Sequence, residues 1–128
     1  DMANELAKKF VPKVIERPND LIEKDETLSS DNQTRMEKAY EVASEGNVIK
    51  AKETYEKLYK NSPQSDSLVY NLAYCEHLLG NYGAASKLFQ KYLSLSRDPN
   101  SDAQKYLDEA NQWVSKGITQ VLRDNVVL

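Results

Sequence analysis

Few side chains in this sequence have types and spacing that could do chemistry together, and the first pair is Cys75 and His77. A cysteine beside a histidine suggests a nucleophile and the base that activates it. Two residues apart on a helix, however, these side chains project about 200° apart around the axis and lie on opposite faces. We therefore interpret Cys75 as a small core residue. We expect His77, the single histidine, at the rim of a binding surface.

A second set of residues resembles a calcium-binding loop. Residues 98–102, Asp-Pro-Asn-Ser-Asp, followed by Glu109, nearly match the spacing of the ligands in such loops. Ala103 stands where the loop needs a glycine for its sharp turn, and the proline stiffens the chain. We therefore interpret these residues as a connection in which Ser101 or Asp102 caps the following helix.

The composition argues against several other classes of function. The four glycines are scattered and form no phosphate-binding loop, and no side chains have the spacing of a metal site or of paired catalytic carboxylates. We predict no catalytic residue, no metal and no cofactor, hence a protein that is not an enzyme. A net charge of −3, without a basic stripe, argues against nucleic acid as a partner. No apolar run approaches the roughly 20 residues that cross a bilayer, so we expect no direct membrane insertion.

The elements that would position these residues repeat at an offset of 34 residues. The matching pairs are Ala39–Tyr40 with Ala73–Tyr74, Gly46–Asn47 with Gly80–Asn81, Ala51 with Ala85, and Tyr55 with Phe89. A fixed period between 20 and 50 residues is typical of repeat architectures, in which each unit buries its apolar face against its neighbours.

Each copy of the repeat predicts a helical hairpin within residues 31–100. Apolar and small residues recur at three- and four-residue intervals over about 32–63 and again over about 66–97. Gly46 and Gly80 interrupt the two patterns and suit the left-handed residue that ends a helix.

The two flanks of the hairpins differ from each other. Residues 101–123 carry one apolar stripe and predict a C-terminal capping helix, in which Trp113 anchors on Leu88, Tyr92 and their neighbours. Residues 124–128 are expected to form a tail. Residues 1–30 predict a short helix up to about residue 11, because Pro12 interrupts the pattern, followed by a polar linker from Pro18 to Ser30.

The second hairpin resembles the tetratricopeptide repeat pattern of large, Leu, small, Gly, aromatic, Ala, aromatic, at Val69, Leu72, Ala73, Gly80, Tyr82, Ala85 and Phe89. The first hairpin follows the pattern less closely. The resemblance implies an all-α fold, a right-handed α-α superhelix of helical hairpins. It also implies that the first helix of each hairpin lines a concave groove, where members of this family mostly bind peptides or helices of partner proteins.

Carried over to this sequence, the groove residues that we expect to bind a partner are Met36, Tyr40, Tyr70, Asn71, Tyr74 and His77. The aromatic rings and Met36 would supply apolar contact, whereas Asn71 and His77 would supply polar anchors. An asparagine can hold the backbone of an extended peptide with its donor and its acceptor together. Of the residues with which some co-chaperones of the family grip an acidic C-terminus, only Asn71 is matched here. An uncharged or amphipathic ligand is therefore expected.

The three groove tyrosines also fit a structural interpretation, in which they pack against a neighbouring segment of the chain. One such segment is the N-terminal run that contains Leu6, Phe10, Val11 and Val14. Tyr55, Tyr82 and Tyr106 fit core positions instead.

These patterns predict a non-catalytic protein–protein interaction module that binds a peptide or helix of a partner in its groove. The alternative is a structural module, either a homo-oligomer or the end of a longer repeat array in a multiprotein complex. The free cysteine favours the cytoplasm, whereas removal of an N-terminal signal would favour a periplasmic, secreted or lipid-anchored protein.

Overall fold

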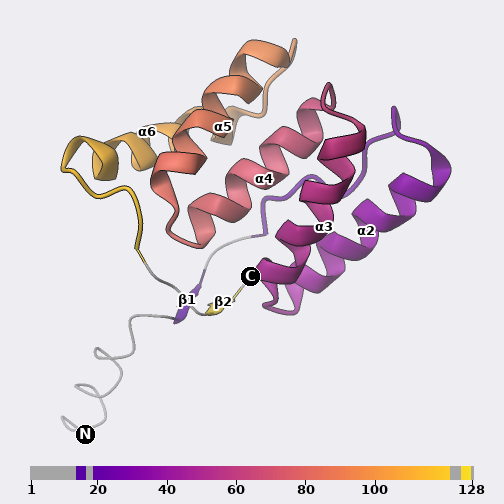
Figure 1. The fold of residues 1–128 in the computed structure, drawn as a ribbon, viewed down its shortest axis with the longest axis horizontal. Coiled ribbons are helices and arrows are strands. Elements are labelled where there is room, and N and C mark those ends of the chain that lie inside the picture. Colours follow the sequence, from indigo (N-terminus) through magenta and orange to yellow (C-terminus); the bar gives the residue numbers. More distant parts are fainter. Residues whose placement is uncertain (1–13, 17–18, 122–124, 128) are drawn as a thin grey trace, which may run out of the picture.

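The computed structural model describes residues 14–16, 19–121 and 125–127 of the 128-residue chain. Within these residues the chain is all-α, as the sequence predicts, apart from two strands of three residues each (Figure 1). The elements are β1 (Val14–Glu16), α2 (Ser30–Ser44), α3 (Val48–Asn61), α4 (Asp66–Leu78), α5 (Tyr82–Leu95), α6 (Ser101–Ser115) and β2 (Asn125–Val127). The helix expected up to about residue 11, and the run with Leu6, Phe10 and Val11, lie outside the described residues.

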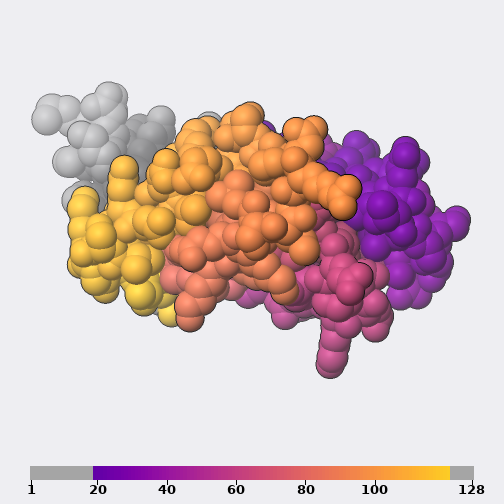
Figure 2. Space-filling model, turned by 90° about the horizontal axis from the view of Figure 1, so that it is seen from above, coloured from indigo at the N-terminus to yellow at the C-terminus, as the bar shows by residue number. Residues whose placement is uncertain are grey.

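The helices form two hairpins, α2–α3 and α4–α5, followed by the single helix α6. Gly46 and Gly80 end the first helix of each hairpin with φ angles of 96° and 83°, the left-handed conformation that the sequence predicts. Each helix packs mainly on the next one in the chain, and α6 also contacts α4. Figure 2 shows the same order along the long axis of the molecule, from the indigo to the yellow end. Small residues let these helices approach closely, and all four are buried: Ala39, Ala51, Ala73 and Ala85.

Helix α4 is the centre of the core. Ten of its 13 residues are buried, compared with three of the 15 residues of α2. Helices α3, α5 and α6 all pack on it. A helix that is covered on all sides has no solvent face, so its polar side chains need partners inside the protein.

The C-terminal helix is shorter than expected, because it ends at Ser115 and not near residue 122. Gly117 adopts a φ angle of 78°, its N–H donates to the carbonyl of Val114, and the N–H of Ile118 donates to that of Trp113. These bonds close the helix in the manner of a glycine C-cap. The chain then returns to the turn between α4 and α5, where the N–H of Val121 donates to the carbonyl of Gly80 over 2.8 Å.

The expected anchor of Trp113 on Leu88 and Tyr92 is wrong. The indole stacks on the ring of Tyr82, with centroids 5.4 Å apart, and remains 38% exposed. The cause is the direction of α6, whose last turn lies beside the first turn of α5. The hydroxyl of Tyr92 instead accepts a hydrogen bond from the backbone N–H of Asn100.

Residues 19–28, named here the 19–28 segment, contain no helix or strand but are not a detached linker as expected. Three residues of the segment are buried: Leu21, Asp25 and Leu28, with exposed fractions of 6%, 7% and 8%. In Figure 1 the segment passes behind α4 and α3 before it reaches α2. Strand β1, which precedes the segment in the chain, pairs in parallel with β2. The expected C-terminal tail thus contributes three residues to a strand pair.

Candidate functional site

Most of the residues expected to line a groove on one face of α2 and α4 are buried. Met36, Tyr70 and Asn71 are 0% exposed, and Tyr74 and His77 are 1% exposed. Tyr40 is half-buried. The face is therefore closed in this structure, and the question becomes what covers it.

The cover is the 19–28 segment, which touches the first helix of each hairpin and α6. Asn19 donates to the hydroxyl of Ser44 at the end of α2, and the hydroxyl of Tyr106 on α6 donates to Asp20. Near the start of α2, the side chain of Gln33 donates to the carbonyl of Leu28 over 2.8 Å. The segment thus runs antiparallel to α2, along the face that the repeat pattern assigns to the groove.

The side chain of Asn71 binds the backbone of the 19–28 segment. The N–H of Ile22 donates to Oδ1 of Asn71 over 2.8 Å, and Nδ2 of Asn71 donates to the carbonyl of Ile22 over 2.9 Å. The side chain of Asn71, which is fully buried, thereby satisfies both the N–H and the carbonyl of Ile22. Because the contact uses only main-chain atoms of Ile22, it does not depend on the side chain at that position.

A buried carboxylate fixes the segment beside the first turn of α4. Asp25 accepts hydrogen bonds from the hydroxyl of Ser65 at 2.6 Å and from the hydroxyl and N–H of Thr27 at 2.6 and 2.9 Å. Ser65 is also the N-cap of α4. Burial opposes the charge on Asp25, but the hydrogen bonds outweigh it and hold the pKa of this carboxyl below its usual value.

Aromatic rings form the floor beneath the segment. Tyr74 lies between Tyr70 and Tyr106, with ring centroids 6.2 and 5.0 Å away, and Tyr70 also contacts Tyr92 at 5.2 Å. The hydroxyl of Tyr70 is buried without a hydrogen-bond partner among the described residues. Burial, and then the charge of Asp20, raise the pKa of this hydroxyl. The floor therefore contains one polar group that the segment does not satisfy.

His77 is not at the rim of the groove, as expected, but inside the core. Its Nε2 lies 3.0 Å from Oε2 of Glu109, which joins α4 to α6. The rings of Tyr82 and Tyr106 lie 5.5 and 5.3 Å from the imidazole. Cys75 is fully buried, and burial raises the pKa of its thiol, so the side chain packs as a small apolar residue. The two side chains form no nucleophile–base pair in this arrangement.

The loop considered for calcium forms a helix cap. Oδ1 of Asn100 accepts from the N–H of Asp102 over 2.9 Å, so the cap residue is one position before the two that we expected. Across the described ranges, no three acidic, histidine or cysteine side chains gather as metal ligands.

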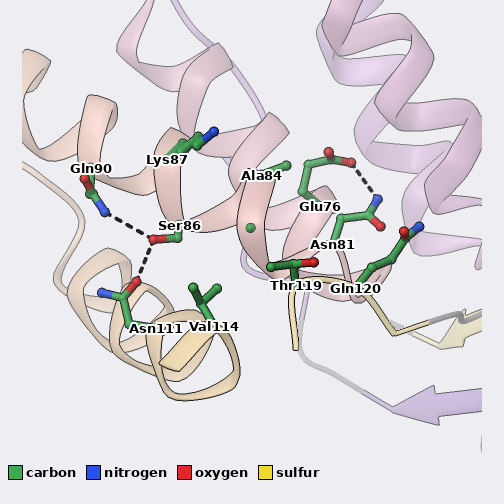
Figure 3. Close-up of a pocket in the computed structure, with 11 residues that line it drawn as sticks. Glu76, Asn81, Ala84, Ser86, Lys87, Gln90, Asn111, Val114, Thr119 and Gln120 are labelled. Atoms are coloured by element: carbon green, nitrogen blue, oxygen red, sulfur yellow. Dashed lines mark hydrogen bonds between the residues drawn. The ribbon is translucent and has the colours of Figure 1, made fainter. Parts of the chain in front are cut away.

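Sequence reasoning missed a hollow of about 960 Å³ on a different face, between α5, α6 and residues 119–120 (Figure 3). Ser86 donates to Oδ1 of Asn111 over 2.6 Å and accepts from Gln90 over 3.1 Å. At the other end of the hollow, Asn81 donates to Glu76 over 3.2 Å. The polar side chains here mostly satisfy one another. The wall at Thr119 exists only because α6 ends early, which the sequence pattern did not indicate.

Sequence reasoning also missed the residues of the segment itself, of which Asp20, Leu21, Ile22 and Asp25 make the contacts described above. The available signal was the pair of large aliphatic residues, Leu21 and Ile22, within an otherwise polar stretch.

Comparisons with protein-family models, with curated proteins and with solved structures gave no match to this chain. None of the helices in the described part of the chain is long and apolar enough to span a membrane.

Proposed function

We propose that this protein is a non-catalytic interaction module of the tetratricopeptide type, which binds an extended segment of a partner protein on the face formed by α2, α4 and α6. The observation that carries the proposal is the pair of hydrogen bonds between Asn71 and the backbone of Ile22. A fully buried side chain that both donates to and accepts from the backbone of one residue is suited to binding a peptide.

The side chains around Asn71 support the same function. Tyrosine rings form the floor, and such rings give large contact area at a small cost in conformational entropy. On α2 a stripe faces the 19–28 segment, in which Gln33 and Ser44 hydrogen-bond to it and Glu37 forms an ion pair with Lys24 at 3.6 Å. Tyr40 belongs to this stripe by its helical spacing and is half-buried, so it offers a partner an accessible ring.

The experiment introduces a photo-crosslinking phenylalanine derivative at Tyr40, which preserves the aromatic ring, and at Lys87 as a control. Lys87 is exposed and lines the hollow of Figure 3, so it reports on the other face. The proposal expects a partner protein crosslinked from position 40 in cells that express this chain, and not from position 87. Crosslinking from position 87 alone would assign binding to the hollow. Crosslinks only between copies of this chain would favour self-assembly.

A further inference from the structure

The 19–28 segment occupies the face on which the proposed function requires a partner, and its contacts describe the partner that would fit there. From its N-terminal end the segment presents a carboxylate to Tyr106, a buried leucine, a residue held by its backbone, and a second carboxylate three positions later at Ser65. The occupant is thus an acidic–aliphatic stretch without helix or strand over residues 19–25, followed by a turn in which the N–H of Leu28 donates to the carbonyl of Asp25, and it belongs to the same chain.

Two features indicate that this occupant is replaceable. Its contacts with α4 and α6 use the backbone of Ile22 and the side chains of Asp20 and Asp25, and Leu21 beside them is buried. A segment of similar sequence would supply all of these groups. The hydroxyl of Tyr70 is buried and lacks a hydrogen-bond partner among the described residues. A segment that satisfied this hydroxyl would gain a contact that the 19–28 segment lacks, because an unmet buried polar group costs free energy.

Resting on the proposed function, we propose that the 19–28 segment is an internal ligand that closes the binding face, and that a partner segment of the same acidic–aliphatic class binds by displacing it. The partner segment is extended and carries Asp or Glu, two aliphatic residues, and a second carboxylate three positions after the second aliphatic residue. Binding is then controlled by the open fraction of the protein, because the apparent dissociation constant is the intrinsic one divided by that fraction.

The test uses the full chain and a fluorescent peptide with the sequence of residues 19–28. Leu21→Ser weakens the internal ligand without changing any residue of α2, α4 or α6, since Leu21 is a buried residue of the segment. Peptide binding is measured by fluorescence anisotropy for the parent and for this variant. We expect the variant to bind the peptide at least about tenfold more tightly than the parent, because more of it is open.

A second peptide, methylated on the backbone nitrogen of the isoleucine, tests the role of Asn71. It removes the N–H that donates to Oδ1 of Asn71 while keeping every side chain. We expect it to bind the Leu21→Ser variant at least about tenfold more weakly than the unmodified peptide. Equal binding of the two peptides, or equal binding of the unmodified peptide to parent and variant, would overturn the proposal.

Controls keep the result decisive. If Leu21→Ser loses its helical circular dichroism, Asp20→Ala serves as a milder opening variant, because it removes the acceptor for the Tyr106 hydroxyl and changes no buried apolar residue. Loss of folding in both would show that the segment is a fixed part of the fold and would overturn the proposal. A doubled mass of the opened variant would identify a second copy as the occupant and would also overturn it. A partner crosslinked at position 40 without any peptide exchange would leave the proposed function standing and refute only this inference.

Discussion

The two polar faces of the molecule differ in what their side chains bind. On the face of α2, α4 and α6, Asn71 is fully buried and bonded to the backbone of another segment. On the hollow of Figure 3, Asn111 is exposed and bonded to the side chain of Ser86. One asparagine thus binds the backbone of another segment inside the protein, whereas the other forms a solvent-accessible pair with a side chain.

The two faces also differ in how the non-helical segment beside each of them is attached to the helices. The 19–28 segment is held by side chains of three helices, from Ser44 to Tyr106 and Asn71. Residues 118–121, which border the hollow, are held by backbone hydrogen bonds to Gly80 in the α4–α5 turn and to Gly83 at the start of α5. Side-chain contacts can be made equally by a competing segment, whereas the backbone bonds at Gly80 depend on the exact path of this chain.

The largest expected effect comes from a substitution at Gly80, which would displace residues 118–121 beside the hollow. A Cβ at Gly80 would lie 2.0 Å from the carbonyl oxygen of Val121, and the residue also has a φ angle of 83°. Gly117 has a similar φ angle of 78° but nothing within 4 Å of its Cβ position, which makes it the matched control.

We expect Gly117→Ala to lower the free energy of unfolding by about 1–2 kcal/mol, the cost of the left-handed conformation. Gly80→Ala should lower the free energy of unfolding by about 1–3 kcal/mol more than Gly117→Ala does, because residues 118–121 must also move. Urea unfolding followed by circular dichroism measures both. Equal losses would contradict the close contact between the turn and Val121.

A smaller effect compares the two asparagines directly. Asn71→Ala leaves the N–H and the carbonyl of Ile22 without their partner in a part-buried site, so we expect a loss of about 1–3 kcal/mol in the free energy of unfolding. Asn111→Ala should cost less than about 0.5 kcal/mol, because water can replace the lost bond to Ser86. Similar losses in the two variants would remove the distinction between the faces.

The smallest effect is the dependence of stability on pH through Asp25. Its carboxyl has a lower pKa in the folded protein than its ordinary value of 3.8, so the folded state favours the charged form. The resulting stabilisation is fully present above that ordinary value and is lost as the pH falls through the lower folded pKa.

The free energy of unfolding of Asp25→Asn should therefore fall less steeply than that of the parent as the pH is lowered from about 5 to below the ordinary pKa of an aspartate. Thermal unfolding at a series of pH values measures this difference. Parallel curves for the parent and the variant would show that the hydrogen bonds from Ser65 and Thr27 do not favour the charged carboxylate.

The hairpins could be predicted from the sequence, because their signals are local and repeated. The spacing of small and apolar residues and the glycines at positions 46 and 80 specify two hairpins, whose turns adopt the expected conformation. The end of α6 could not be predicted as well. Ile118 and Val121 continue the apolar stripe of the helix in the sequence, whereas Gly117 ends the helix in the structure.

The candidate site could be predicted only in part. The repeat pattern predicted a groove lined by Met36, Tyr40, Tyr70, Asn71 and Tyr74, whereas the structure buries all of them except the half-buried Tyr40. Asn71 does bind main-chain atoms, though those of its own chain. The occupant could not be identified, because an extended segment has no periodicity and Leu21 and Ile22 lie among polar residues. His77 was misplaced because its hydrogen bond with Glu109 depends on the packing of α6, which no local pattern encodes.

The central claim is that Asn71 holds the backbone of Ile22 on the closed face of α2, α4 and α6, and hydrogen exchange at the amide of Ile22 tests it most directly. Measured by nuclear magnetic resonance, this amide should exchange far more slowly than in a free peptide of residues 19–28, because opening the segment must precede exchange. In Asn71→Ala the protection should be lost while the amides of α4 remain protected. Exchange of the Ile22 amide in the parent at the rate of the free peptide would contradict the account.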